Sequence, residues 1–194
     1  MRKEIPPNAN SLIMSMRSLG YSLNNAVADI IDNSISAKAT KIDIICSWDN
    51  QEPFVEIKDN GIGMTSEELE EAMRLGSKNP LHERDKEDLG RFGLGLKTAS
   101  FSQAKKLIVK TKQNENTYEA IWDLDLIEKE NKWFMDIEKL DGKNAFKEKG
   151  TTIRWEKIDT LEKKDKTNAQ EYFESVTSQL IKHISLVFHR YISG

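Results

Sequence analysis

AVADIIDNSISAKATKI, residues 26–42, carries a carboxylate and an amide one helical turn apart, at Asp29 and Asn33. Ser22 is a favourable N-cap residue, and small or apolar residues recur at helical spacing after it, so we predict a helix to about Ala37. Side chains four residues apart share a helix face, which places Asp29 beside Asn33. An acid and an amide at this spacing are usually surface groups, so the pair indicates a site only together with other motifs.

The pair suits the chemistry of phosphoanhydride hydrolysis, which needs an oriented water and a metal that neutralises phosphate oxygens. A side-chain amide oxygen is a hard ligand of the kind that Mg²⁺ accepts, so Asn33 is a candidate metal ligand. The carboxylate of Asp29 is a candidate base for the attacking water. Asp32 lies about a third of a turn away from Asn33, and we assign it no chemistry.

The second motif is DNGIGM, residues 59–64, at the end of the strand-like run PFVEIKD. A buried carboxylate at Asp59 would need a hydrogen-bond donor, and the exocyclic amine of adenine is one. Gly61 and Gly63 would let the backbone lie against a flat ring, and Met64 is soft enough to pack on it. The alternative interpretation is a plain Asp-Asn-Gly hairpin turn.

The third motif is the glycine-rich run GRFGLGLKTAS, residues 90–100. A P-loop is excluded because Leu96 separates Gly95 from Lys97, and a dinucleotide fingerprint is excluded because Thr98 stands where glycine or alanine is needed. The glycines let the chain bend and then begin a helix, whose free N–H groups attract phosphates. Lys97 would add a cation there, with a plain surface lysine as the alternative.

The rest of the chain predicts an α+β fold in which helices cover one face of a mainly antiparallel sheet. Six runs read as strands: KIDIICSW, PFVEIKD, KKLIVKTK, NTYEAIWDL, KWFMDIEKL and GTTIRWEKI. Residues 76–92 are polar and lack periodicity, which is typical of a lid or of a disordered loop. Residues 168–192 predict an amphipathic C-terminal helix, with one apolar side formed by Phe173, Val176, Leu180, Ile184 and Val187.

Composition narrows the functional classes. The 194 residues suffice for one domain, which we expect to fill the chain behind an N-terminal extension over residues 1–8. A net charge of −3 gives no general attraction to nucleic acid or anionic lipid. Cys46 is the single cysteine, so no internal disulfide can form. No apolar run is long enough to span a membrane, and we expect a cytoplasmic protein.

Taken in order, Asp29 with Asn33, DNGIG, GRFGLGLKTAS and Gly150-Thr151 resemble the GHKL superfamily. That group includes the DNA gyrase B proteins, the heat-shock chaperones of the ninety-kilodalton class, sensor histidine kinases, MutL and the MORC proteins. The resemblance covers roughly residues 8–155. It implies the Bergerat fold, a two-layer α/β sandwich with a mainly antiparallel mixed sheet, in which ATP lies between helices and sheet under a lid.

The resemblance assigns Mg²⁺ to Asn33, adenine to Asp59 and a hydroxyl contact in the adenine site to Thr151. Asp29 stands where the family has its general-base glutamate. Because aspartate is one methylene shorter, either the helix sits closer, the aspartate acts through a second water, or hydrolysis is slow. With the reasoning from the residues, the predicted nucleotide contacts are Asn33, Asp59, Gly61, Gly63, Met64, Gly93, Gly95, Leu96, Lys97 and Thr151.

Within the superfamily the pattern resembles MORC proteins or bacterial stand-alone ATPases most, and residues 26–42 also resemble MutL. The stretch FGLGLKT departs from MutL and is closer to MORC proteins and the chaperones. The three histidines are His82, in the predicted lid, and His183 and His189, in the predicted last helix. No histidine in a helical hairpin precedes the first motif, which argues against a sensor kinase.

We therefore predict Mg²⁺-dependent binding of ATP, slow hydrolysis, and a nucleotide-driven switch in which two copies associate through a downstream region. In relatives a following domain contributes a lysine to the γ-phosphate. We expect this chain to be a fragment of a longer protein, with little or no ATPase activity alone. Two alternatives stay open: a phosphotransferase of the histidine-kinase type, and a degenerate nucleotide-binding scaffold without turnover. We predict no membrane partner, and nothing indicates nucleic acid binding by this domain.

Overall fold

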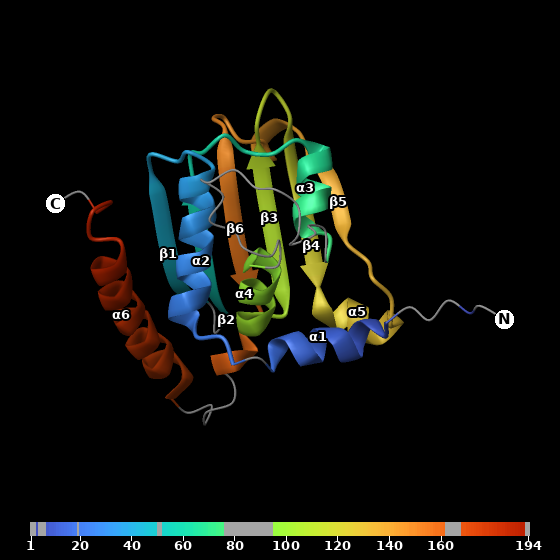
Figure 1. Cartoon of the computed structure of the whole chain (residues 1–194), viewed down its shortest axis with the longest axis horizontal. Coiled ribbons are helices and arrows are strands. Elements are labelled where there is room, and N and C mark those ends of the chain that lie inside the picture. The colour runs from blue at the N-terminus through green and yellow to red at the C-terminus, as the bar shows by residue number, and fades with distance from the viewer. Residues whose placement is uncertain are drawn as a thin grey trace.

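The computed structural model describes residues 3, 7–18, 20–49, 52–75, 95–161 and 168–192. Its centre is a six-stranded sheet with the strand order β1-β2-β6-β3-β4-β5 (Figure 1). The strands are β1 (Ile42–Asp49), β2 (Glu52–Asp59), β3 (Lys106–Lys112), β4 (Thr117–Asp123), β5 (Asp136–Leu140) and β6 (Gly150–Glu156). The predicted antiparallel sheet is confirmed, and the described strands contain none of the parallel pairs that a mixed sheet would add.

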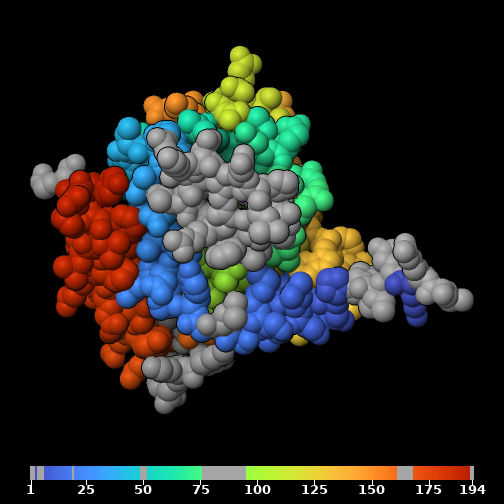
Figure 2. Space-filling view, in the orientation of Figure 1, coloured from blue at the N-terminus to red at the C-terminus, as the bar shows by residue number. Residues whose placement is uncertain are grey.

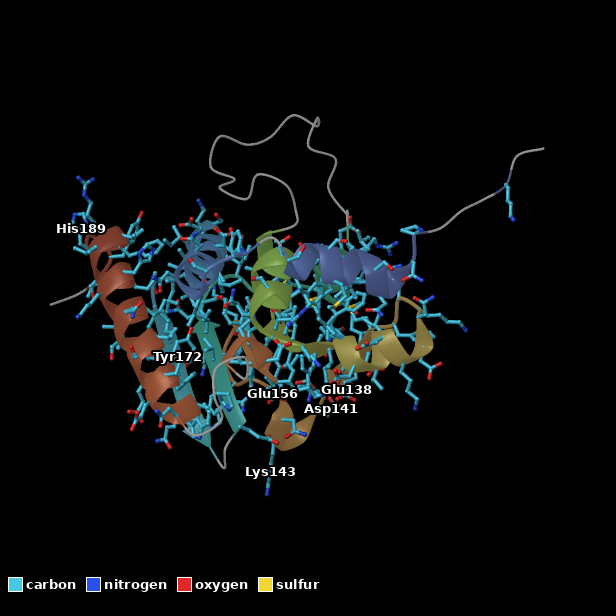
Figure 3. The ribbon with its side chains drawn as sticks, turned by 90° about the horizontal axis from the view of Figure 1, so that it is seen from below. Glu138, Asp141, Lys143, Glu156, Tyr172 and His189 are labelled. Carbon is cyan, nitrogen blue, oxygen red and sulfur yellow. The ribbon has the colours of Figure 1, made fainter. Side chains whose placement is uncertain are left out.

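The helices form a second layer, which confirms the α+β class. They are α1 (Ala9–Arg17), α2 (Leu23–Ser36), α3 (Ser66–Met73), α4 (Gly95–Gln103), α5 (Leu124–Glu130) and α6 (Ala169–Val187), with the 3-10 turns η1 (Gly142–Asn144) and η2 (Asp159–Leu161). Helices α1, α2 and α4 lie on the same side of the sheet (Figures 1 and 3). The nucleotide site predicted between helices and sheet therefore has two layers to lie between.

Local sequence signals fix where two of the helices begin. The Ser22 hydroxyl accepts the N–H of Asn25 at 3.2 Å and so caps α2. Thr65 and Glu68 form a capping box at α3, in which each side chain accepts the backbone N–H of the other residue, at 3.2 and 2.8 Å. The first start agrees with the helix predicted after Ser22, and the second has the sequence pattern typical of a capping box, TSEE at residues 65–68.

The core lies between the sheet and the helices, as the alternation along β3 shows. Leu107, Val109 and Thr111 are buried, whereas the residues between them are partly exposed. Helix α4 is fixed onto the middle of this sheet because the indole N–H of Trp155, on β6, donates to the Ser100 hydroxyl at 2.8 Å. Thr111 is the last of these buried residues along β3 and is polar, so the apolar core ends there and the candidate site begins beside it.

The opposite face of the sheet is polar, and several of its charges are paired. Arg154 bonds Glu56 at 3.2 Å and Glu156 at 2.8 Å, and its guanidinium lies 3.7 Å from the centre of the Phe54 ring. Figure 3 shows Glu138 and Glu156 on the side of the sheet away from α1, α2 and α4. Arg154 pairs with both Glu56 and Glu156, so opposite charges on neighbouring strands compensate one another on this solvent-facing side.

Helix α6 packs at the β1 edge of the molecule, and Figure 2 shows its surface directly beside that of α2. Phe173 contacts Trp48 of β1, with ring centroids 5.7 Å apart. Leu180 is buried, and Ile184 packs against the core. These contacts confirm the helix and the middle of its predicted apolar side.

The predicted end of this helix was wrong. The helix stops at Val187 rather than at residue 192, and the Val187 side chain is 51% exposed. Phe188 is buried instead, and its ring contacts Tyr191 at a centroid distance of 6.3 Å. The chain leaves helical geometry at Phe188, so the helical spacing that assigned Val187 to the packed side no longer applies there.

Helix α5 was not predicted, because it follows β4 without a loop. Asp123 ends the strand and caps the helix by accepting the Asp125 N–H at 3.1 Å. Leu124 and Ile127 are buried, which anchors this short helix through two side chains. The sequence LDLIEKE has too few residues for helical periodicity to be recognised.

The predicted lid, residues 76–92, lies outside the described residues, as do Gly93 and most of the N-terminal extension. Within the part of the chain that is described, none of the helices combines the length and the apolarity that crossing a bilayer requires.

Candidate functional site

Asp59 is the centre of the candidate site. It ends β2, pairs in register with Thr151 of β6, and is only 7% exposed. Its Oδ1 accepts the backbone N–H groups of Gly61 at 2.8 Å and Thr151 at 3.3 Å, and its Oδ2 accepts the Ser34 hydroxyl at 3.0 Å. Burial raises the pKa of the Asp59 carboxyl, while these hydrogen bonds act in the opposite direction.

The Asp59 carboxylate keeps capacity for a ligand. An ionised carboxylate offers about four acceptor positions, and the three protein donors leave one on Oδ2. A buried acceptor with an unused lone pair favours a ligand that brings an N–H donor. An exocyclic purine amine meets that requirement, so the arrangement is consistent with the predicted adenine contact.

The backbone of Gly61 and Gly63 is packed against other elements, for a reason the sequence did not show. A Cβ at Gly61 would lie 2.8 Å from the carbonyl oxygen of Ala37, at the end of α2. Gly63 has φ +70°, and a Cβ there would lie 2.0 Å from the carbonyl oxygen of Lys112, at the end of β3. Glycine at these positions brings the loop after β2 against both neighbours, whether or not a ring lies above it.

A network of hydroxyl groups extends the site from Asp59 to β3. The Thr111 and Thr151 hydroxyls, on adjacent strands, are 3.1 Å apart. Thr111 Oγ1 also accepts the N–H of Met64 at 2.9 Å and donates to the Gly150 carbonyl at 3.2 Å. Thr111 therefore holds both Met64 and Thr151, two predicted nucleotide contacts, in fixed positions.

Sequence reasoning missed Thr111 and Ser34. Both are almost fully buried, with exposed fractions of 0% and 3%. The signal that could have found Thr111 is the alternation in KLIVKTK, where a polar residue occupies an inward position. Ser34 follows Asn33 directly, but its hydroxyl points toward Asp59 of β2, which only the packing of α2 on the sheet shows.

Asn60, in contrast, has a structural task. Its Oδ1 accepts the backbone N–H groups of Thr40 and Lys41, both at 2.9 Å, and its Nδ2 donates to the Thr40 hydroxyl at 2.9 Å. The side chain thus ties the turn between α2 and β1 to the end of β2. In the DNG motif, the aspartate faces the site and the asparagine holds the turn.

Helix α2 supplies Asp29 and Asn33 to the same region. Asp29 is half-buried and Asn33 is exposed. In the described residues, no hydrogen bond occupies the amide of Asn33, so its oxygen is available as a hard ligand for Mg²⁺ together with water and phosphate oxygens. No group of three or more histidine, cysteine, aspartate or glutamate residues in the described part of the chain could hold a metal.

Asp29 lies at the N-terminal end of α4. A Cβ on Gly95, the first residue of α4, would be 3.8 Å from Asp29 Oδ2. The same oxygen accepts a hydrogen bond from the Tyr21 hydroxyl, a contact that sequence reasoning also missed. Asp32, on the same helix, has its pKa raised by burial and by the charge of Asp29.

The glycine-rich run is only partly described. Gly93 lies outside the described residues, Gly95 begins α4, and Leu96 is partly buried. Lys97 is 1% exposed, and its Nζ donates to the carbonyls of Ala72 at 2.8 Å and Arg74 at 2.6 Å, at the end of α3. The structure therefore brings Asp29 and Gly95 together, while it directs the Lys97 amine to α3 and not to the surface.

Comparison with known proteins gives a match that covers most of the chain. A family model described as "Histidine kinase-, DNA gyrase B-, and HSP90-like ATPase" matches residues 21–165. All the predicted site residues fall within that range. Helices α1 and α6 fall outside it.

Two curated relatives resemble about half of this chain. The ATPase morc-1 of Caenorhabditis elegans is 32% identical over 90 residues, which are 46% of this chain and 10% of that protein. The DNA mismatch repair protein MutL of Rickettsia prowazekii is 33% identical over 92 residues, which are 47% of this chain and 15% of that protein. The chain thus corresponds to a small part of the length of either relative.

Proposed function

This chain belongs to the family of histidine kinase-, DNA gyrase B- and HSP90-like ATPases, and from that premise we propose that it binds ATP with Mg²⁺, hydrolyses it slowly and acts as a nucleotide-driven switch. Membership of an ATPase family supports ATP binding. Hydrolysis, the metal and the switch are the further parts of the proposal, and each has its own test.

The position of Asp59 is the observation that carries the proposal for nucleotide binding. Its Oδ2 retains an acceptor position beside the bond from Ser34, and the loop of Gly61 lies directly next to it. We assign the exocyclic amine of adenine to that position. Thr151, opposite Asp59 on β6, supplies a hydroxyl on the same side of the sheet.

The triphosphate is assigned to the space between α2 and the start of α4. The first N–H groups of an α-helix have no partner within the helix and attract phosphate oxygens. Asn33 would hold Mg²⁺ through its amide oxygen, and the metal would supply neutralising charge to the phosphates. Because Asp29 lies beside Gly95, the proposed base is next to the proposed phosphate site.

For hydrolysis we assign to Asp29 the role of general base. The carboxylate would take a proton from the water that attacks the γ-phosphorus, while the bond to the leaving oxygen of ADP breaks and inorganic phosphate forms. The short aspartate favours slow turnover. Replacement Asp29→Glu tests this point, because hydrolysis that appears or rises with the longer carboxylate would show a competent pocket with a weak base.

The binding proposal is tested by calorimetric titration of ATP and ADP, with and without Mg²⁺, on the wild type and on Asp59→Asn. In Asp59→Asn the side-chain N–H group would face the exocyclic N–H group of adenine, so two donors would meet without an acceptor. We therefore expect the affinity for ATP to fall by about 30-fold or more. Asp43→Asn is a matched control, since it removes the same charge from the half-exposed surface of β1. Equal affinity of the two variants for ATP would contradict the assignment.

Two alternatives make different predictions. A phosphotransferase would transfer label from γ-labelled ATP to protein. The described histidines do not favour it, because His183 and His189 belong to α6 and its end, at the β1 edge of the sheet (Figure 1). A scaffold without turnover would bind ATP and release no phosphate, even with glutamate at position 29.

For the switch, we propose that ATP binding promotes association of two copies through a region outside this chain. The relatives morc-1 and MutL are far longer than the segments they share with it. Sedimentation of the full-length protein with ATP, with ADP and without nucleotide tests this part. A mass that does not depend on nucleotide would contradict it.

A further inference from the structure

Tyr21 contacts the proposed base directly. It precedes the N-cap residue of α2, and its hydroxyl donates a hydrogen bond to Oδ2 of Asp29, about two helical turns further along. Within the described residues, Tyr21 is the only hydrogen-bond partner of the Asp29 carboxylate. One carboxylate oxygen is therefore occupied by a protein donor, and Oδ1 is left for a water molecule.

The tyrosine is itself held at its backbone. Gln103, at the C-terminal end of α4, donates from Nε2 to the Tyr21 carbonyl at 2.8 Å and is 4% exposed. Asp29 lies beside Gly95, at the other end of the same helix. The main chain of Tyr21 is thus bonded to one end of α4, and its hydroxyl is bonded to Asp29, whose carboxylate lies beside the other end.

The end of α4 that holds Tyr21 is fixed in turn. Arg17 of α1 donates from Nη1 to the carbonyls of Phe101 and Ala104, and its other nitrogen pairs with Asp159. These contacts satisfy carbonyls that the helix C-terminus leaves without partners. Tyr21 therefore starts from a rigid support, as a group that orients another side chain requires.

The hydroxyl is a permanent donor. Its hydrogen bond to Asp29, burial, and the negative charge of Asp29 together raise the pKa of Tyr21 to about 12. At neutral pH the tyrosine therefore stays protonated, so it can orient the carboxylate and cannot act as the base itself.

We propose that Tyr21 is a positioning residue that fixes the Asp29 carboxylate, so that its free oxygen faces the water attacking ATP. This inference rests on the proposed function and deepens it. Asp29 Oδ1 accepts the proton of that water as the new bond to phosphorus forms and the bond to ADP breaks, while the tyrosine proton stays on Tyr21. An aspartate carboxylate held in one orientation is in the geometry needed for proton transfer more of the time than one that rotates freely.

The test compares Tyr21→Phe with the wild type under single-turnover conditions, with protein in excess over labelled ATP. Phenylalanine keeps the ring and removes only the hydroxyl. We expect the hydrolysis rate to fall about tenfold while the dissociation constant for ATP stays unchanged. Tyr191→Phe, at a position 68% exposed near the end of α6, is the matched control and should leave both quantities as they are.

A double-mutant cycle separates positioning from a structural effect. If Tyr21 acts through Asp29, adding Tyr21→Phe to Asp29→Asn lowers the rate no further, because the carboxylate it orients is absent. An equal fall in both backgrounds would assign Tyr21 a structural role and overturn the inference. A faster Tyr21→Phe variant would also overturn it, since the hydroxyl would then be withholding the carboxylate from water.

A measurement without nucleotide tests the hydrogen bond between Tyr21 and Asp29 itself. Ultraviolet titration follows the ionisation of the four tyrosines. The transition at highest pH should vanish in Tyr21→Phe and move to lower pH in Asp29→Asn. An unmoved transition in Asp29→Asn would overturn the inference. If the wild type fails to bind ATP, the proposed function is wrong. If the wild type binds ATP but hydrolyses it no faster than Asp29→Asn does, only the positioning role of Tyr21 is wrong.

Discussion

The hydroxyls of Thr111 and Thr151 lie 3.1 Å apart on neighbouring strands, although 40 residues separate them in the sequence. This bond joins the end of β3 to the strand that faces Asp59. Through Met64, whose N–H also donates to Thr111, it reaches the loop after β2. Thr111 is therefore the residue on which the predicted adenine site depends for its shape.

Replacement Thr111→Val tests this dependence. Valine has a similar shape but no hydroxyl, so the Met64 N–H and the Thr151 hydroxyl lose a buried partner, and we expect a loss of about 1–3 kcal/mol in unfolding free energy. ATP affinity should fall about tenfold. Thr152→Val, on the other face of the same sheet, is the control and should leave affinity unchanged. Urea unfolding measures the unfolding free energy, and calorimetry measures the affinity for ATP. An unchanged affinity in Thr111→Val would contradict the role of Thr111 in shaping the adenine site.

Replacement Gly63→Ala tests the contact between the loop after β2 and the end of β3. The positive φ and the clash with the Lys112 carbonyl should together lower the unfolding free energy by about 2–5 kcal/mol. Gly142→Ala is a close control, because Gly142 also has positive φ, at +61°, but no atom within 4 Å of an added Cβ. It should cost about 1–2 kcal/mol. Equal losses in the two variants would show that the clash is relieved without cost.

The raised pKa of Asp59 predicts how stability depends on pH. The folded protein keeps the carboxyl proton at pH values where the unfolded chain, with an aspartate pKa of about 3.9, has released it. Stability contributed by this group therefore falls as the pH rises through the interval between the two pKa values. Asp59→Asn lacks this titration, so it should gain stability relative to the wild type over that interval and keep the gain above it.

Urea unfolding of both proteins at a series of pH values measures this difference. The expected result is a variant that binds ATP poorly but unfolds no more easily than the wild type at neutral pH. A wild type that becomes more stable relative to Asp59→Asn as the pH rises would contradict the assigned cause, which is burial of the Asp59 carboxylate.

Replacement Lys97→Met separates two roles for this lysine. The hydrogen bonds from Nζ to the carbonyls of Ala72 and Arg74 predict a structural role, with a loss of about 2–4 kcal/mol in unfolding free energy. Lys58→Met, on the exposed face of β2, is the control and should change stability by less than about 0.5 kcal/mol. A loss of ATP affinity without a loss of stability would favour the phosphate contact predicted from the sequence.

The elements that the sequence predicted are those defined by local signals. The Ser22 cap and the strand-like runs each depend on a few neighbouring residues. The same holds for the capping box at Thr65 and Glu68 that the structure shows. Helix α5 was missed because seven residues carry too little periodicity. The end of α6 was wrong because a change of backbone direction at Phe188 leaves no mark in the spacing of apolar residues.

In the candidate site, too, the sequence could predict residues that stand in local motifs but not residues whose roles come from packing. Asp29, Asn33 and Asp59 could be chosen from the sequence because each stands in a short motif. Ser34, Thr111 and Tyr21 could not, since their roles come from contacts between different elements of the fold. For Lys97 the sequence left a phosphate contact and a surface lysine open. It could not show that the amine is buried against the end of a helix that precedes it by more than twenty residues.

The most direct test of the central claim is a crystal structure of this chain with Mg²⁺ and a non-hydrolysable ATP analogue. The quantity to measure is the distance from the exocyclic nitrogen of adenine to the Asp59 carboxylate. We expect a hydrogen bond of about 3 Å to Oδ2, with the ring next to Gly61. A nucleotide whose base lies away from Asp59, with the carboxylate still bound only by Ser34, Gly61 and Thr151, would contradict the account.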